Sequence, residues 1–319
     1  MECCGLTSVG LKRSNNEDQF LIADICKSMR LHQTSLALDH QTRMFGQTQG
    51  KLLLVADGMG GHEAGERASQ LVTDEIVDYI LNRLTWFMAD AYASEKEFEE
   101  QLKYALLSCQ NRINREVEQV PQHSGMGSTL TMAYITWPML FVVHVGDSRC
   151  YLFRDGVLEQ LTRDHTLARL AAESHTVSLD FPYGDGTVPN SDDAHNSSSP
   201  KGYMSNVLWN VIGGGIDNKP IPDAKAYELR KGDTLLLCSD GLSNMLSRQE
   251  IEAILSQDIG TDTICSRLVD AANDSGGSDN ITVVVSRFMD RTSRETLSVE
   301  VVLPLDDTKA DTVDFEESK

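Results

Sequence analysis

A short apolar run that ends in an aspartate and a group of glycines is the feature that most constrains this chain. Residues 51–65 read KLLLVADGMGGHEAG, so the apolar stretch 52–56 stops at Asp57 and Gly58 follows at once. This pattern predicts a buried strand that delivers a carboxylate into a tight turn before a helix begins. Alone it fits an ordinary turn as well as a metal site, because Asp-Gly is also common turn chemistry.

Three further aspartates lie at the ends of apolar runs: Asp147, Asp240 and Asp279. If those runs are neighbouring strands, the four carboxylates meet, and like charges in one place repel without cations. An all-oxygen site without matching His or Cys prefers Mg²⁺, Mn²⁺ or Ca²⁺. Two such ions can activate a water and neutralise a phosphoryl group, and Arg13 is suited to bind phosphate oxygens through two donors. The residues therefore predict metal-assisted hydrolysis of phosphate esters.

The charge and the apolar pattern restrict partners and location. The 319 residues include 48 acidic and 28 basic ones, a formal charge of −20, which argues against nucleic acid and anionic membrane surfaces as partners. No apolar stretch has the length of a membrane span, and the N-terminus lacks a signal-peptide core. We therefore expect a cytoplasmic protein without a membrane segment. Seven scattered cysteines predict reduced thiols rather than a disulfide framework.

Hydrophobic periodicity predicts both helices and antiparallel strands. Apolar residues at three-four spacing predict long amphipathic helices over 64–84 and 98–120. Successive strands with short turns over 128–161 predict an antiparallel sheet, and residues 25–50 read as an irregular or hairpin-like excursion. The other predicted strands are 5–10, 19–24, 207–212, 224–229, 233–239 and 280–287, and the other predicted helices lie near 165–173, 248–257 and 262–273.

Two segments have the composition of loops. Residues 177–203 are dense in Gly, Pro, Ser, Asn and Asp, which predicts a surface loop of a kind that is often functional. Residues 291–319 form an acidic tail that we expect to be largely disordered, although 297–303 could add one strand. We therefore expect one catalytic domain over 1–290, followed by the tail.

Seven short motifs follow one another along the chain. They are RSNNED at 13–18, VADGMGGH at 55–62 with AGE at 64–66, GST at 127–129, VGDSR at 145–149, LTRDH at 161–165, CSDGL at 238–242 and GSDNIT at 277–282. In this order they resemble the motifs of the metal-dependent Ser/Thr protein phosphatases of the 2C (PPM) class, in their bacterial style. The resemblance implies a four-layer α-β-β-α sandwich of class α+β, with two antiparallel β-sheets flanked by helices.

The resemblance also implies the metal ligands. Asp57 would bridge two ions, Mn²⁺ or Mg²⁺, and the carbonyl of Gly58 would bind one of them. Asp240 and Asp279 would hold the other ion. Asp147 matches the position that, together with Asp240, can hold a weaker third ion in bacterial-style members.

The resemblance further implies how the phosphate ester is attacked. A water or hydroxide that bridges the two ions would attack in line, with Arg13 binding the phosphate and with Glu17 and Asp18 acting through metal-bound waters. Eukaryotic-style members place a histidine, proposed as the general acid, two residues after the bridging aspartate, where this chain has Met59. His62 lies three residues further on. The general acid is therefore either His62 or a metal-bound water.

The family carries a mobile flap beside the active site, and here that insertion covers about 166–212. It ends in NVLWNVIGGG at 206–215 instead of a TRALGG-like sequence with an arginine, which puts substrate preference in doubt more than catalysis. Two nearby histidines have simpler interpretations. We expect His165 to hold a loop by hydrogen bonds and His144 to be a satisfied strand residue.

Two functions remain open at this point. The first is an enzyme that hydrolyses phosphoserine and phosphothreonine in proteins and so reverses a Ser/Thr kinase. The second is a catalytically weak pseudophosphatase that binds phosphoproteins as a signalling module. The implied ligand set and the phosphate-binding arginine are all retained, which favours catalysis. We expect phosphorylated protein substrates, a cognate Ser/Thr protein kinase and a monomer.

Overall fold

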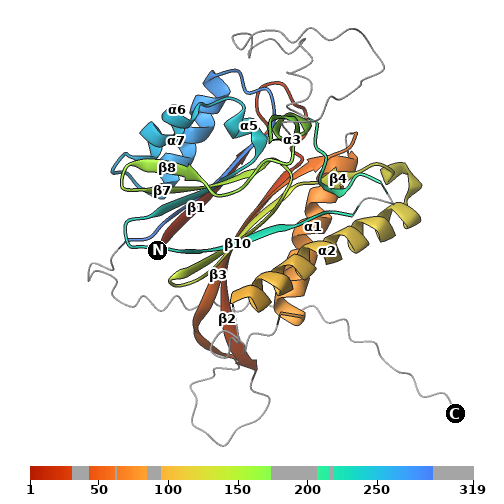
Figure 1. The fold of residues 1–319 in the computed structure, drawn as a ribbon, viewed down its shortest axis with the longest axis horizontal. Helices are drawn as coiled ribbons and strands as arrows, with labels where there is room; N and C mark the ends of the chain where they lie inside the picture. The colour runs from red at the N-terminus through yellow and green to blue at the C-terminus, as the bar shows by residue number, and fades with distance from the viewer. Residues whose placement is uncertain (31–42, 62, 85–94, 174–206, 216–218, 290–319) are drawn as a thin grey trace, which may run out of the picture. The chain divides into compact units, whose positions relative to one another are not determined.

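Two antiparallel β-sheets lie face to face, and helices cover both outer faces (Figure 1). The computed structural model describes residues 1–30, 43–61, 63–84, 95–173, 207–215 and 219–289. The predicted α-β-β-α sandwich of class α+β is therefore confirmed. The predicted acidic tail, with its possible strand, and most of the predicted flap lie outside the described residues.

Both sheets are built from antiparallel pairs of strands. The five-stranded sheet has the order β1 (Glu2–Ser8), β12 (Ile281–Arg287), β11 (Thr234–Cys238), β7 (Arg149–Arg154) and β8 (Val157–Gln160). The seven-stranded sheet has the order β10 (Asp223–Glu228), β6 (Met139–Val145), β5 (Leu130–Thr136), β3 (Arg43–Met59), β4 (Gly127–Ser128) and β9 (Ile212–Gly213), with β2 (Asp18–Arg30) paired to β3.

β2 and β3 form a long hairpin. Its pairing runs from Asp18 opposite Asp57 to Arg30 opposite Arg43, and the register shifts twice just beyond Ile25. The hairpin-like excursion expected from the sequence is thus confirmed. One end of this ladder carries two of the predicted site carboxylates on directly opposed residues.

The helices divide between the two outer faces. α1 and α2 pack on one another, and both contact the seven-stranded sheet, whereas α5, α6 and α7 lie on the five-stranded sheet (Figure 1). None of the described helices has the length and apolar content that a bilayer crossing requires. Their bounds are α1 (Glu63–Asn82), α2 (Glu95–Gln119), α3 (Leu167–Glu173), α5 (Asp240–Ser243), α6 (Arg248–Leu255), α7 (Thr261–Asp274) and the short 3₁₀ helix η2 (Pro121–His123).

The apolar run 52–56 of β3 is buried on both sides. Leu52, Leu54 and Ala56 pack in the layer under α1 and α2. Leu53 and Val55 point the other way, into the layer between the two sheets. Because successive side chains of a strand face opposite sides and both sides are covered, the run is apolar throughout instead of alternating.

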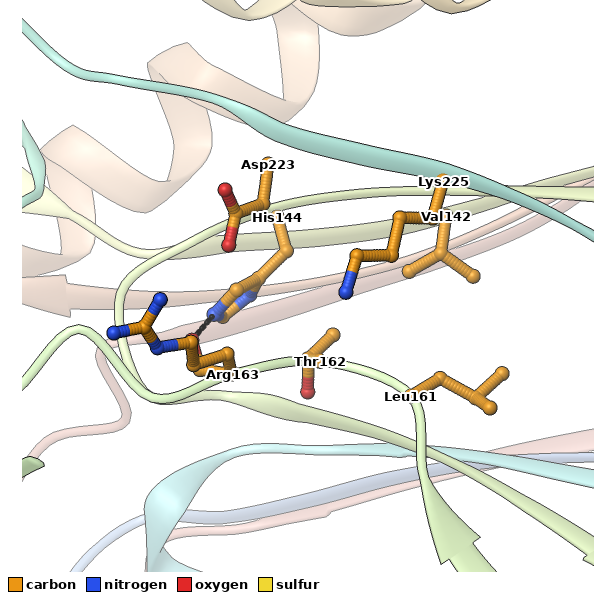
Figure 2. Close-up of a pocket in the computed structure, with 7 residues that line it drawn as sticks. All are labelled: Val142, His144, Leu161, Thr162, Arg163, Asp223 and Lys225. Carbon is orange, nitrogen blue, oxygen red and sulfur yellow. Dashed lines mark hydrogen bonds between the residues drawn. The ribbon is translucent and has the colours of Figure 1, made fainter. Parts of the chain in front are cut away.

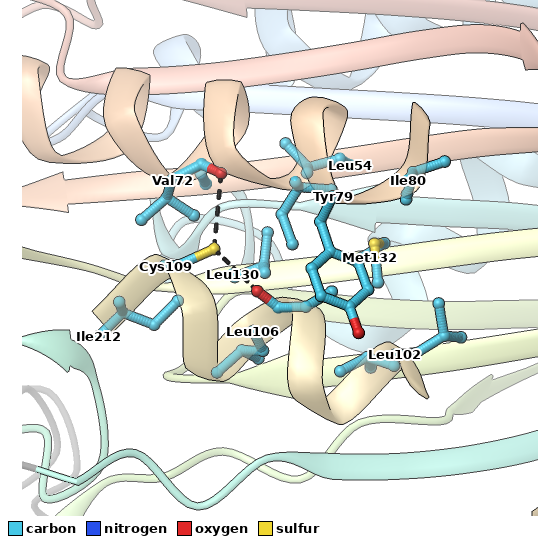
Figure 3. Packing of buried hydrophobic residues seen from close by; sticks show 14 of the residues in the cluster. Leu54, Val72, Tyr79, Ile80, Leu102, Leu106, Cys109, Leu130, Met132 and Ile212 are labelled. Atoms are coloured by element: carbon cyan, nitrogen blue, oxygen red, sulfur yellow. Dashed lines mark hydrogen bonds between the residues drawn. The ribbon is translucent and has the colours of Figure 1, made fainter. Parts of the chain in front are cut away.

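The layer between the helices and the seven-stranded sheet is closely packed. Figure 3 shows Cys109 of α2 pointing toward Val72 of α1, and the Cys109 thiol donates to the Val72 carbonyl at 3.7 Å; Leu106 of α2 and Met132 of β5 belong to the same buried cluster. All seven cysteines are free thiols, and four of them are buried, as the scattered spacing predicted.

One predicted strand, 207–212, is wrong in its extent. Only β9 and an isolated bridge between Thr166 and Leu208 form there. The side chain of Asn210 instead pairs with the backbone of Ile221, donating to its carbonyl at 2.8 Å and accepting from its N–H at 2.9 Å. The backbone of Ile221 is thus bound by a side chain, and no continuous strand forms over 207–212. The one-turn helix α5 was not predicted, because four residues are too few to show a period.

We expect Leu106→Ala to lower the free energy of unfolding by about 2–5 kcal/mol, because it empties a fully buried site in this layer. The neighbouring Leu107 is 36% exposed on the same helix, so Leu107→Ala should change stability by less than about 0.5 kcal/mol. Urea unfolding of both variants measures the difference. Equal losses would show that the layer is not packed as described.

Candidate metal and phosphate site

The ends of β2 and β3 hold two carboxylates in a fixed relation. Asp18 and Asp57 are directly opposed in the antiparallel register. The backbone N–H of Asp57 donates to the Thr129 hydroxyl at 3.0 Å, and the Asp57 carbonyl accepts from the Thr129 N–H at 2.8 Å. The GST motif therefore anchors the turn that carries Asp57.

Two glycines let a helix approach this turn closely. A Cβ on Gly58 would lie 2.0 Å from the carbonyl oxygen of Gly65, and a Cβ on Gly65 would lie 2.6 Å from the Glu17 carboxylate. The Gly58 N–H and the Ser69 hydroxyl both donate to the Glu17 carbonyl, at 3.1 and 2.6 Å. The start of α1 thus rests directly on the turn, and no larger residue fits at either glycine.

Asn280, directly before β12, fastens the N-terminal loop between β1 and β2. Its side-chain oxygen accepts from the Glu17 N–H at 2.8 Å, and its amide nitrogen donates to the carbonyls of Val9 and Asn15 at 3.0 and 2.9 Å. The Asn280 N–H is in turn bound by the Asp279 carboxylate at 2.9 Å. This role was missed in the sequence, because the partners lie more than 260 residues away along the chain and leave no local signal.

Arg13 lies beside Asp279. Its guanidinium donates to the Asp279 carboxylate at 2.7 Å, and the Arg13 side chain is 52% exposed. Hydrogen bonding to Asp279, followed by the charges of Glu17 and Asp57, raises the pKa of Arg13. An arginine has five N–H donors, so the exposed part of this fork is available to a ligand.

The aspartates at the strand ends influence one another electrostatically. Burial raises the pKa of Asp18 and of Asp147 to about 7, and that of Asp240 to about 6. Burial also raises the pKa of Asp57 well above its ordinary value, and the charges of the other four aspartates, Asp279 included, add to this effect. The structure therefore brings together all five aspartates that the sequence predicted, which lie far apart along the chain.

The donor set fits a divalent cation. Asp18 Oδ1 is buried and has no hydrogen-bond partner among the described residues, although Oδ2 accepts from the Ser239 hydroxyl at 2.7 Å. An all-oxygen carboxylate set with a buried oxygen that lacks a partner is what Mg²⁺ and Mn²⁺ prefer. Within the described part of the chain, however, no three acidic, His or Cys side chains already form a metal-binding group. Asp240 and Asp279 are turned toward Asn244 and Arg13.

The individual ligand assignments therefore stay predictions. His62, one of the two candidates for the general acid, lies outside the described residues. The described turn does place Gly58 directly after Asp57 and buries it, so its carbonyl belongs to the same local backbone. The backbone position of Asp147 depends on the preceding Gly146. The φ of Gly146 is 110°, and its close approach to Thr129 leaves no room for a side chain at position 146.

A small cavity lies elsewhere, and none of the candidate site residues lines it (Figure 2). Its volume of about 10 Å³ is close to the least that holds one water molecule. The lining residues are Val142, His144, Leu161, Thr162, Arg163, Asp223 and Lys225. This cavity is too small for a phosphorylated residue, so it does not compete with the aspartate cluster as a substrate site.

We expect Asn280→Asp to lower the free energy of unfolding by about 2 kcal/mol, because two carbonyls lose their donor while the acceptor for Glu17 remains. The loop that carries Arg13 should loosen with it. Chemical unfolding measures the loss, and the exposed Asn111→Asp on α2 is the control. Matching stabilities for the two variants would contradict the anchoring role.

The metal-free protein should lose stability as the pH rises. Asp18 holds its proton more tightly in the folded protein, since its pKa is raised from 3.8 to about 7. That contribution is complete below about pH 4 and is lost as the pH rises through 7. We expect the unfolding free energy of the wild type, relative to Asp18→Asn, to fall by about 1 kcal/mol per pH unit between pH 5 and 7 in EDTA. Parallel pH profiles for the two proteins would rule this out.

Comparisons with known proteins agree with this geometry. A family model described as protein phosphatase 2C matches residues 31–272. The serine/threonine phosphatase stp of Listeria monocytogenes is 32% identical over 234 residues, which cover 73% of this chain and 83% of that protein. Protein phosphatase PhpP of Streptococcus pneumoniae is 32% identical over 286 residues, which cover 89% of this chain and 96% of its own.

Solved structures give the same picture. The crystal structure of the Mycobacterium tuberculosis serine/threonine phosphatase PstP/Ppp has a TM-score of 0.66 and 30% identity, and the match covers 90% of this chain and 98% of that one. The catalytic domain of PstP in complex with two manganese ions has a TM-score of 0.63 and 29% identity, with 91% and 98% covered. Motifs, fold, aspartate cluster and relatives all lead to one assignment, and this chain belongs to the protein phosphatase 2C family.

Proposed function

We propose that this protein hydrolyses phosphoserine and phosphothreonine residues of proteins with the help of Mn²⁺ or Mg²⁺, and that it reverses the action of a Ser/Thr protein kinase. The observation that carries the proposal is the aspartate cluster, in which buried Asp18 lies opposite Asp57 and partly buried carboxylates raise one another's pKa beside an exposed arginine. Relatives from Listeria and Mycobacterium are named Ser/Thr phosphatases, and one PstP structure holds two manganese ions.

The aspartates would form a ligand set for two cations and a weaker third. Asp57 would bridge two ions, with the Gly58 carbonyl on one and with Asp240 and Asp279 on the other. Asp147 would join Asp240 at the third. When bound, divalent ions supply an activated water for in-line attack and neutralise charge on the phosphoryl group. Burial of the carboxylates strengthens their hold on a cation, because water competes poorly there.

Arg13 would orient the phosphate. Its planar fork matches two phosphate oxygens, and the half-exposed side chain reaches solvent while Asp279 holds one of its nitrogens. This contact fixes the fork next to the aspartates, so a phosphate bound by it lies close to them. Substrate binding and activation are thereby joined in one place.

The backbone around Glu17 and Asp18 would hold these two carboxylates ready to bind ordered waters. The carbonyl of Glu17 accepts from two donors, and Asp18 lies on the strand end opposite Asp57. For the proton that the leaving serine or threonine oxygen needs, the candidates are His62 and a water molecule. The proposed roles of the aspartates are the same whichever of these two groups donates the proton.

With Mn²⁺ or Mg²⁺ we expect the protein to hydrolyse p-nitrophenyl phosphate and a phosphothreonine peptide, and we expect EDTA to abolish both reactions. Asp57→Asn and Asp240→Asn should each lower kcat/KM by several orders of magnitude, because each removes a charge that holds a cation. The exposed Asp270→Asn on α7 is the matched control and should retain full activity. If Asp240→Asn turned over substrate in EDTA as fast as the wild type does with Mn²⁺, the proposed mechanism would be wrong.

The same assay separates this enzyme from a pseudophosphatase. A protein that only binds phosphoproteins would retain phosphopeptide without releasing inorganic phosphate at any Mn²⁺ concentration. If the wild type releases phosphate from the peptide and Asp57→Asn does not, the protein is an enzyme and not a pseudophosphatase.

A further inference from the structure

His165 lies at a junction between three separated parts of the chain. It is buried, with 3% of its surface exposed, and follows β8 in the LTRDH motif. Its ring stacks on His144 at 4.9 Å and meets Trp209 edge-on at 5.2 Å. The proposed mechanism gives this ring no chemical step, yet both of its nitrogens have partners.

The first connection runs to the loop that carries Asp147. The backbone N–H of Gly146 donates to the ring Nδ1 of His165 at 3.1 Å. The backbone N–H of His165 donates in return to the Gly146 carbonyl at 2.8 Å. Gly146 immediately precedes Asp147, and its positive φ bends the chain there. The two hydrogen bonds therefore fix the backbone from which the Asp147 carboxylate projects.

The second connection runs to the segment before β10. Asn210 Nδ2 donates to the same His165 Nδ1 at 3.1 Å, and the Trp209 N–H donates to the His165 carbonyl at 3.0 Å. Asp223, the first residue of β10, accepts from Nε2 at 3.2 Å. Asn210 is itself bound to the backbone of Ile221, so the ring joins both ends of this segment.

These partners define the protonation of the ring. Two N–H donors point at Nδ1, so Nδ1 must be an acceptor, and Nε2 carries the hydrogen that Asp223 accepts. His144, stacked against it, has a pKa lowered to about 4 by burial and is neutral near pH 7. A hydrocarbon side chain in place of His165 would leave the buried Gly146 N–H without an acceptor.

We infer that His165 is a positioning residue for the weaker third cation: through Nδ1 it fixes the Gly146–Asp147 backbone, so that Asp147 is held where it can bind an ion together with Asp240. Asp147 and Asp240 lie beyond the same end of the β7–β11 pair, because Arg149 is opposite Cys238 in the antiparallel register and each aspartate is two residues beyond that pair. The inference rests on the proposed function, because it needs the cation sites described there. It adds a residue that touches neither metal nor substrate.

Two isosteric substitutions of the full-length protein separate the two ring nitrogens. The side-chain oxygen in His165→Asn replaces the Nδ1 acceptor for Gly146 but does not reach Asp223. The amide nitrogen in His165→Gln replaces the Nε2 donor to Asp223 but leaves Gly146 unpaired. Binding of Mn²⁺ is followed by calorimetric titration and by electron paramagnetic resonance of free Mn²⁺, and Asp147→Asn identifies the weakest site by removing it.

We expect His165→Gln to weaken Mn²⁺ at the weakest site by about tenfold or more, the range seen when residues that orient metal ligands are changed. The two tighter sites should stay within about twofold. His165→Asn should keep the weakest site within about threefold of the wild type. A purely structural role would instead lower the melting temperature of both metal-free variants and leave the relative affinities of the sites unchanged.

The result that overturns the inference is equal Mn²⁺ binding by His165→Gln and His165→Asn, whether both retain the weakest site or both lose it. If His165→Gln does not fold, Asp223→Ala replaces it, because Asp223 is half-exposed and its loss frees the ring to change tautomer. That variant should weaken the same site at least about threefold, and unchanged binding would also overturn the inference. A wild type that turns over phosphopeptide but binds only two Mn²⁺ ions overturns the inference alone, whereas a wild type that neither binds Mn²⁺ nor turns over phosphopeptide overturns the proposed function as well.

Discussion

Mutual repulsion between closely placed, partly buried carboxylates is the constraint on which the rest of this structure depends. The five aspartates of the cluster come from five separate positions along the chain, and burial and proximity raise the pKa values of Asp18, Asp57, Asp147 and Asp240. A fold that gathers such charges loses stability unless protons or cations neutralise them. The surrounding sheets must therefore be rigid enough to hold the carboxylates in place when no cation is bound.

That rigidity comes from backbone contacts rather than from ion pairs. Asn280 binds the N-terminal loop at three points, and Gly58 and Gly65 let α1 pack directly against the turn. Thr129 holds Asp57 by both its N–H and its carbonyl. The carboxylate side chains are thus left to respond to a ligand while the main chain beneath them is fixed.

The sequence predicted those features that depend on neighbouring residues. The apolar run before Asp57 indicated a strand covered on both faces, and the aspartates at strand ends indicated where the site would lie, while the ordered motifs indicated the family. His165 makes the loop-holding hydrogen bonds expected of it, but its particular partners and the role of Asn280 could not be predicted in this way, because those partners are distant along the chain. The extent of the strand expected at 207–212 was wrong for a related reason: the Asn210 side chain binds the backbone of Ile221, a contact that the apolar pattern does not indicate.

The β2–β3 hairpin also limits how chains of this architecture can vary in length. Its register shifts occur just beyond Ile25, whereas pairing is regular from there to Asp18 and Asp57. A residue inserted toward the tip of the hairpin can be taken up as a further bulge, which leaves the opposed aspartates in register. The same insertion on the other side of Ile25 would turn one of the two carboxylates to the opposite face of the sheet. Insertions and deletions can therefore accumulate beyond Ile25, whereas the number of residues between Ile25 and the opposed aspartates must stay constant.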